Sequence, residues 1–81
     1  MVKVFFFGRL ADAIGRELEV EMPVGSSIGQ LRERLIADHP DAEQPLRSIR
    51  SRACVDDVLV PETFLLAVAD RVEFLPPVSG G

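Results

Sequence analysis

The chain has 81 residues, of which 47% are hydrophobic and 27% are charged, a balance typical of one small globular domain rather than of a disordered segment. The formal net charge of −4 argues against binding to nucleic acid, because proteins of that class normally carry a basic face. The single cysteine, Cys54, cannot form an internal disulfide, so we expect a reducing, cytoplasmic setting. No apolar run has the length of a signal peptide or a membrane span, and no membrane association is expected.

The first part of the chain contains two predicted strands. Residues 2–7 are mostly β-branched or aromatic, which is typical of a strand. Residues 17–22 alternate between glutamates and apolar side chains, which predicts a second strand with one solvated face. Between these strands, residues 10–14 have helical spacing for about one turn.

The main helix is predicted to begin at Ser27 and to be stopped at residues 38–40. Ser27 and Gln30 form a capping-box pattern, and a residue before proline disfavours the helical conformation. One apolar stripe is expected to face the core: Ile28, Leu31, Leu35 and Ile36. Three charged residues are predicted to lie largely off this stripe: Arg32, Glu33 and Arg34.

The second half of the chain predicts further strands. Residues 41–52 have an irregular pattern, although Leu46 and Ile49 are spaced for another helical turn. Residues 53–60 predict two short strands around an acidic turn, and residues 71–75 predict a last strand. One main helix on one face of a mixed sheet, with the first and last strands side by side at its centre, gives an α+β domain of the β-grasp type. We expect this domain to span residues 1–75.

One face of this sheet is left without a helix to cover it. Since side chains alternate along a strand, Phe5 and Phe7 are expected opposite the helix, together with Leu75 and with Leu59 as a further candidate. Two interpretations remain open. The apolar patch is either a surface for a partner, or it is covered by residues 41–52 or by the loop 61–69.

The last six residues form a tail that differs from the rest of the chain: Pro76, Pro77, Val78, Ser79, Gly80 and Gly81. The prolines cannot donate to a strand ladder and favour an extended path, while the two glycines make a tip without side chains. The special chemical group is the terminal carboxylate of Gly81. It is a poor acyl donor until another enzyme activates it, for example as an acyl-adenylate, after which sulfur or an amine can replace the nucleotide.

The chain resembles the MoaD family, the small subunits of molybdopterin synthase. The resemblance is carried by the ending Val72-Glu73-Phe74-Leu75-Pro76-Pro77-Val78-Ser79-Gly80-Gly81, by the opening Val2-Lys3-Val4-Phe5-Phe6-Phe7-Gly8-Arg9-Leu10 and by the helix over residues 27–37. It covers essentially the whole chain, and the tail is its most specific part. It implies a ubiquitin-like β-grasp sulfur carrier of molybdenum cofactor biosynthesis.

The resemblance also implies partners and residue roles. An E1-like, MoeB-like enzyme would use ATP to adenylate Gly81, and a sulfur donor would convert Gly81 to a thiocarboxylate. The tail would enter a large, MoaE-like subunit and give its sulfur to cyclic pyranopterin monophosphate. Positions matching Phe7, Leu59 and Leu75 would contact that large subunit. The chain would then be a non-catalytic subunit of a sulfurtransferase, with no permanently bound cofactor.

The sequence departs from the family pattern at three positions. Ala69 stands in the turn before the last strand where the family usually has glycine, Asp56 where it often has asparagine, and Leu75 where it often has an aromatic residue. The first departure concerns the local turn geometry, and none of the three affects the chemistry at Gly81.

Other functions remain open. The alternatives are a thiamine-type sulfur carrier, a ubiquitin-like modifier that joins Gly81 to lysines, and an interaction module with an inert tail.

The remaining chemically active side chains have ordinary structural interpretations. We interpret His39 as a helix-end residue and expect Cys54 to pack within a short strand. The adjacent carboxylates Asp56 and Asp57 indicate a solvated turn. No spacing in the chain predicts a metal site or a catalytic constellation.

Overall fold

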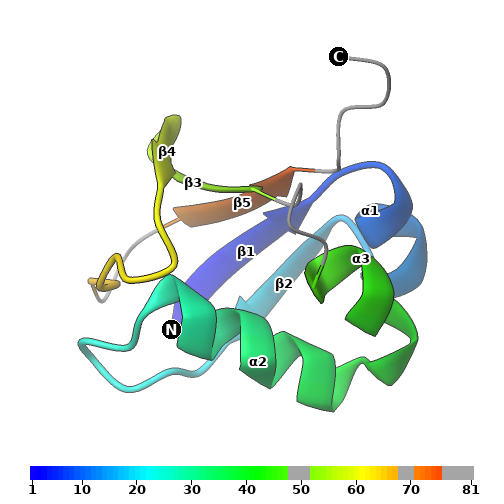
Figure 1. The fold of residues 1–81 in the computed structure, drawn as a ribbon, viewed down its shortest axis with the longest axis horizontal. Coiled ribbons are helices and arrows are strands. Elements are labelled where there is room, and N and C mark those ends of the chain that lie inside the picture. Colours follow the sequence, from blue (N-terminus) through cyan, green and yellow to red (C-terminus); the bar gives the residue numbers. More distant parts are fainter. Residues whose placement is uncertain (48–51, 68–70, 76–81) are drawn as a thin grey trace.

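The computed structural model describes residues 1–47, 52–67 and 71–75. Within these residues, a twisted sheet has its helices on one side (Figure 1). The elements follow the chain in the order β1 (Val2–Phe6), α1 (Arg9–Ile14), β2 (Glu17–Val20), α2 (Ile28–Asp38), the 3₁₀ turn η1 (Pro40–Ala42), α3 (Glu43–Arg47), β3 (Arg52–Val55), β4 (Val58–Val60) and β5 (Arg71–Leu75). Ala69 and the tail over residues 76–81 lie outside the described residues, so the predictions made for them are not tested by the fold.

The strands form one mixed sheet in the order β2-β1-β5-β3-β4. β1 pairs antiparallel with β2 and parallel with β5, while β3 pairs antiparallel with both β5 and β4. The first and last strands therefore lie side by side inside the sheet, as the sequence predicts. The predicted α+β, β-grasp architecture with its main helix on one face is confirmed.

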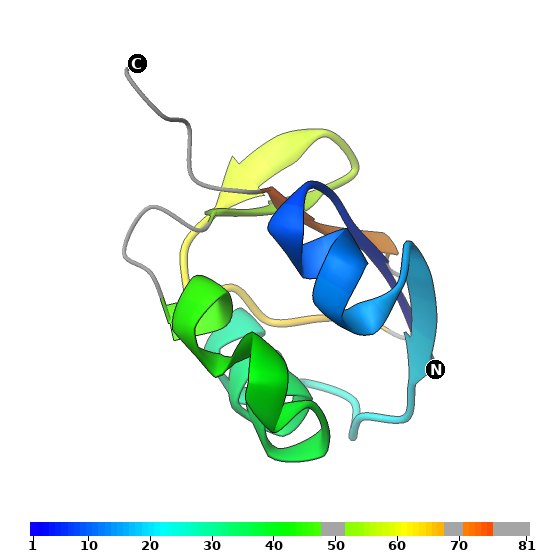
Figure 2. The same cartoon turned by 90° about the vertical axis from the view of Figure 1, so that its right-hand side faces the viewer.

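The helices pack on one face of the sheet (Figure 2), and the core lies between them. Every second side chain along the strands points into this core. Phe6 of β1 and Phe74 of β5 are both buried, and their rings stack with centroids 6.1 Å apart. The other buried side chains of β1 and β5 are those two and four residues away along each strand: Val2, Val4 and Val72.

Helix α2 begins with the predicted capping box. The backbone N–H of Gln30 donates to the Ser27 hydroxyl at 3.1 Å, and the backbone N–H of Ser27 donates to Gln30 Oε1 at 2.8 Å. The helix ends at Asp38, and the backbone N–H of the following His39 donates to the Leu35 carbonyl. The interpretation of His39 as a helix-end residue is confirmed.

The chain between α2 and β3 is more regular than expected. Residues 41–52 were expected to be irregular apart from a helical turn at Leu46 and Ile49, but residues 40–47 are helical throughout and Leu46 is fully buried there. Ile49 lies outside the described residues. Pro45 is compatible with α3 because it lies in the first turn, where its missing N–H has no partner within the helix. The second strand ends at Val20, which pairs with Val2 at the start of β1, instead of at residue 22.

The burial of Arg32 corrects the prediction that it lies off the apolar stripe. Position 32 is four residues from both Ile28 and Ile36, so it shares their side of α2, and Arg32 is only 7% exposed. Its Nε and Nη2 each donate to the Glu62 carboxylate at 2.8 Å, and its Nη1 donates to the backbone carbonyl of Leu46.

The same guanidinium also packs on an aromatic ring of the core. Its Cζ atom lies 5.0 Å from the ring centroid of Phe74, which is a cation–π distance. Arg32 therefore links α2 to α3, to the segment after β4 and to the middle of the sheet.

This linkage predicts that Glu62→Ala lowers the free energy of unfolding by about 1–2 kcal/mol, because it removes the carboxylate that accepts two hydrogen bonds from a buried guanidinium. Glu62 itself is half-exposed, which keeps the expected loss below that of a fully buried pair. Asp38→Ala is the matched control, since it breaks the exposed Arg34–Asp38 pair and is expected to change stability by less than about 0.5 kcal/mol. Urea unfolding followed by circular dichroism measures both, and equal losses would contradict the linkage.

Candidate functional site

The face of the sheet opposite the helices carries the predicted interface residues. Alternation along β1 places Lys3 and Phe5 there, because Val2, Val4 and Phe6 face the core. Phe5 is half-buried, and Phe7, just beyond the end of β1, is 43% exposed. We call this surface the open face.

Strand register joins β4 to β1 across the open face. Leu59 pairs with Cys54, Cys54 pairs with Glu73, and Glu73 pairs with Phe5. Directly paired residues project from the same side of a sheet, so these four side chains form one row. Leu59 is 58% exposed at the outer end of that row.

Leu75 and Phe7 lie together at one end of the open face. The parallel register pairs Phe6 with Phe74, so the next residues along the two strands, Phe7 and Leu75, are neighbours. Leu75 is also paired with Arg52 of β3 and is half-buried. The structure thus places all three predicted interface residues on one face, with Phe7 and Leu75 adjacent and Leu59 two strands away.

The described parts of the two segments that were candidates to cover this face lie elsewhere. Residues 40–47 pack into the core on the helix side. Residues 61–67 run beside the start of α2, where the backbone N–H groups of Ile28 and Gly29 donate to the carbonyls of Phe64 and Glu62. Within the described residues, the open face is therefore left accessible.

Charged side chains are interleaved with the apolar ones on the open face. The Arg71 guanidinium lies over the Phe5 ring, with Cζ 4.7 Å from the centroid, and Lys3 lies 3.7 Å from a carboxylate oxygen of Glu17. Apolar side chains surrounded by charges of both signs are typical of surfaces that bind protein partners.

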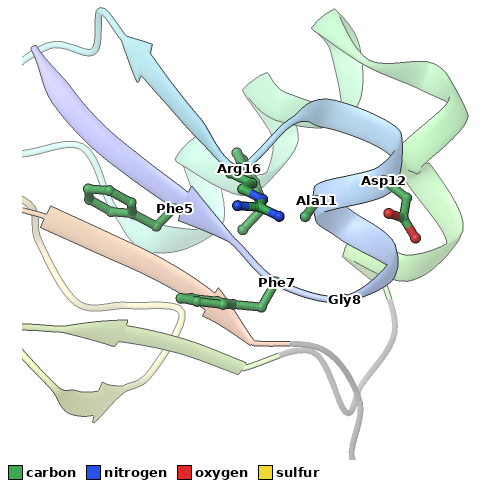
Figure 3. Close-up of a pocket in the computed structure, with 7 residues that line it drawn as sticks. Phe5, Phe7, Gly8, Ala11, Asp12 and Arg16 are labelled. Carbon is green, nitrogen blue, oxygen red and sulfur yellow. The ribbon is translucent and has the colours of Figure 1, made fainter.

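A hollow of about 560 Å³ opens beside the end of β1, next to Phe7. It is lined by Phe5, Phe6, Phe7, Gly8, Ala11, Asp12 and Arg16. Figure 3 shows Arg16 between Phe5 and Ala11, with Asp12 at the far end of the hollow. The sequence pattern placed Phe5 on the uncovered face of the sheet but did not indicate Arg16 as a site residue. Arg16 lies beside the end of β1 because β1 pairs with β2, and this pairing is what a prediction of the hollow would have required.

Cys54 packs within β3, as predicted, and is 8% exposed. Burial raises the pKa of its thiol above the ordinary value, and the nearby carboxylates of Glu73 and Asp57 raise it further. The thiol is therefore held in its protonated, weakly nucleophilic form at neutral pH.

Asp56 and Asp57 form the turn between β3 and β4. Both have left-handed backbone conformations, with φ of 51° and 66°, and both side chains are exposed. Two such residues are what a two-residue hairpin turn requires, and aspartate tolerates that conformation better than most residues. The interpretation of these carboxylates as a solvated turn is confirmed.

Two further features are absent from the described residues. No group of three or more histidine, cysteine, aspartate or glutamate side chains is arranged there to hold a metal ion. No helix in residues 1–47, 52–67 or 71–75 is long and apolar enough to cross a membrane.

Comparisons with known proteins agree with this fold. The solved structure of SAMP1 from Haloferax volcanii is similar with a TM-score of 0.86 and 22% identity, covering 99% of this chain and 98% of that one. A protein of Pyrococcus furiosus described as a putative molybdopterin converting factor subunit 1 has a TM-score of 0.82 and 25% identity, covering 95% and 97%. The fold and its open face thus define a ubiquitin-like β-grasp protein.

Sequence comparison then places the chain within a family. The ThiS family model matches residues 4–81. The molybdopterin synthase sulfur carrier subunit of Mycobacterium tuberculosis is 31% identical over 83 residues, covering 99% of this chain and 96% of the relative. The subunit of the same name from Escherichia coli is 28% identical over the full length of both chains. The chain belongs to the ThiS family, and its resemblance to the MoaD sulfur carrier subunits is confirmed.

The environment of Cys54 predicts slow alkylation of the native chain. Because the thiol pKa is raised, we expect the rate with iodoacetamide near pH 8 to be at least several-fold lower in the native chain than in urea, and to rise only at higher pH. Mass spectrometry of quenched samples over a pH series measures both rates. Equal native and unfolded rates at every pH would contradict this prediction.

Proposed function

We propose that this chain is the sulfur carrier subunit of a molybdopterin synthase. Its Gly81 carboxylate is activated, converted to a thiocarboxylate, and used to supply sulfur to cyclic pyranopterin monophosphate during molybdenum cofactor biosynthesis. The observation that carries the proposal is the similarity to two molybdopterin synthase sulfur carrier subunits, which in one case covers all of this chain, Gly80-Gly81 included.

The proposed chemistry begins outside this chain, because a carboxylate has no good leaving group. An E1-like, MoeB-like enzyme joins the Gly81 carboxylate to the α-phosphate of ATP and releases pyrophosphate. A hydrosulfide supplied by a sulfur donor then attacks the acyl-adenylate, forms the C–S bond of the thiocarboxylate and displaces AMP. The chain contributes the acyl group and carries the sulfur, in line with the expectation that it does not act as an enzyme alone.

The proposed partner for sulfur transfer is a large, MoaE-like subunit that binds the open face. Phe7 and Leu75 lie at the end of the sheet where residue 75 leads into the tail, and Leu59 extends the apolar surface toward β4. A fold neighbour with a TM-score of 0.68 and 22% identity was solved as a complex of subunits 1 and 2 of the molybdopterin-converting factor from Helicobacter pylori. That complex is a precedent for such a pairing in this fold.

The proposal is tested by trapping the sulfur at Gly81. The Cys54→Ala chain is incubated with a MoeB-like enzyme, ATP and a sulfur donor, and then treated with an alkylating reagent. We expect an alkylated thiocarboxylate at Gly81, located by fragmentation in a mass spectrometer. Fragmentation is needed because exchange of oxygen for sulfur changes the mass nearly as much as oxidation of Met1 or Met22.

A chain extended by one alanine after Gly81 is the matched control for this reaction. It keeps the whole domain, but the terminal carboxylate moves by one residue and now belongs to an alanine, which has a side chain. We therefore expect neither the adduct nor molybdopterin formation. An isopeptide between Gly81 and lysines, without a thiocarboxylate, would favour a ubiquitin-like modifier. Sulfur transfer only in a thiazole-forming assay would favour a thiamine-type carrier, and no reaction at Gly81 beside a working control carrier would favour an inert tail.

Phe7→Asp is predicted to weaken binding to the large subunit at least tenfold, because it places a charge where an apolar ring meets the partner. Thiocarboxylate formation at Gly81 is expected to continue. Val24→Asp is the matched control, since Val24 is 77% exposed in the turn before α2, away from the open face. Calorimetric titration of each variant with the large subunit measures the effect, and equal affinities of the two variants would remove Phe7 from the interface.

A further inference from the structure

We propose that the hollow beside the end of β1 is a specificity site in which Arg16 binds a carboxylate of the large subunit. The expected occupant is a segment of that subunit with an aspartate or glutamate next to an apolar side chain. This inference rests on the proposed function, because it takes the large subunit as the partner of the open face.

The shape and chemistry of the hollow fit such a segment. Phe5 and Phe7 form an aromatic wall at one side, and Ala11 of α1 contributes a small side chain that leaves the space open. The volume of about 560 Å³ is large enough to take more than one side chain. Phe7 belongs to both the hollow and the open face, so a partner bound to one surface reaches the other.

Arg16 is the positively charged residue that lines the hollow. Its backbone carbonyl accepts a hydrogen bond from the Phe6 N–H at 3.0 Å, which fixes the backbone beside β1. Within the described residues, its exposed guanidinium has no ion pair or hydrogen bond. By contrast, the guanidinium groups of Arg34 and Arg47 are both paired with carboxylates on the helix side of the molecule.

The opposite charges at the two ends of the hollow set the orientation in which a segment binds there. Arg16 lies at the β1 side and the carboxylate of Asp12 at the far end, beyond Ala11 (Figure 3). A segment bound here therefore places its carboxylate toward Arg16 and its apolar side chain against Phe7. A guanidinium with five donors in a planar fork is suited to bidentate binding of one carboxylate.

The location of the hollow makes this contact relevant to partner choice. Phe7 neighbours Leu75, the last described residue before the tail. A carboxylate bound by Arg16 therefore helps to set the orientation in which the large subunit meets the tail. Charge pairs at the edge of an interface act mainly on association rate and on discrimination between partners.

The inference is tested by measuring the affinity of the large subunit for three variants and the wild-type chain at two salt concentrations. Arg16→Glu is expected to weaken binding at least tenfold, and Arg16→Lys to weaken it only a few-fold, because lysine keeps the charge but not the planar fork. Arg34→Glu makes the same change of net charge on the exposed surface of α2 and is expected to bind like the wild-type chain. Circular dichroism confirms that each variant is folded.

The outcomes separate this inference from the proposed function. Weaker binding of Arg16→Glu than of Arg34→Glu, with a salt dependence that is reduced in Arg16→Glu, supports the site. Equal affinities of these two variants overturn the site and leave the sulfur carrier proposal in place. If the wild-type chain does not bind the large subunit although Gly81 accepts sulfur, both the site and the choice of partner are overturned, while the carrier chemistry stands.

Discussion

The buried guanidinium of Arg32 is the interaction on which the arrangement of the two faces depends. A cation removed from water must find counter-charges and acceptors within the fold, and Arg32 finds them in the Glu62 carboxylate and the Leu46 carbonyl. Glu62 belongs to the segment after β4 and Leu46 to α3, so both segments are held beside α2. The Phe74 ring beneath the guanidinium connects the same cluster to the centre of the sheet. Because these irregular and short helical segments are tied to the helix side, their described residues leave the opposite face of the sheet free for a partner.

Because side chains alternate along β1 and β5, neighbouring residues lie on opposite faces of the sheet. Phe6 and Phe74 stack inside the core, while Phe7 and Leu75, one residue further along each strand, lie on the open face. A shift of one residue in the pairing would exchange these positions and remove both the core and the apolar open face. Since β1 and β5 are adjacent and parallel, their ends lie at the same end of the sheet, which places Phe7 beside the residue that precedes the tail.

Sequence periodicity predicted the strands, the capping box of α2 and the face of the sheet on which Phe7 and Leu59 lie, because each depends on residues close together in the chain. The burial of Arg32 was missed since it depends on Glu62, thirty residues away, although its spacing from Ile28 and Ile36 already placed it on the inner side of the helix. The end of β2 was missed because the alternation continues to residue 22, whereas the pairing with β1 ends two residues earlier. The hollow around Arg16 required the pairing of β1 with β2 and the position of α1, which no local pattern contains.

The environment of Cys54 also fits the proposed carrier chemistry. Cys54 lies on the same face as Leu59 and Glu73, so a reactive thiolate there would stand on the surface offered to the partner. Burial and the carboxylates of Glu73 and Asp57 raise its pKa and hold it as a thiol at neutral pH. A weakly nucleophilic Cys54 is a poor competitor for an activated acyl group or for a sulfur donor. Within this proposal, the fold keeps the Cys54 thiol unreactive, and the thiocarboxylate formed at Gly81 is the group that transfers sulfur.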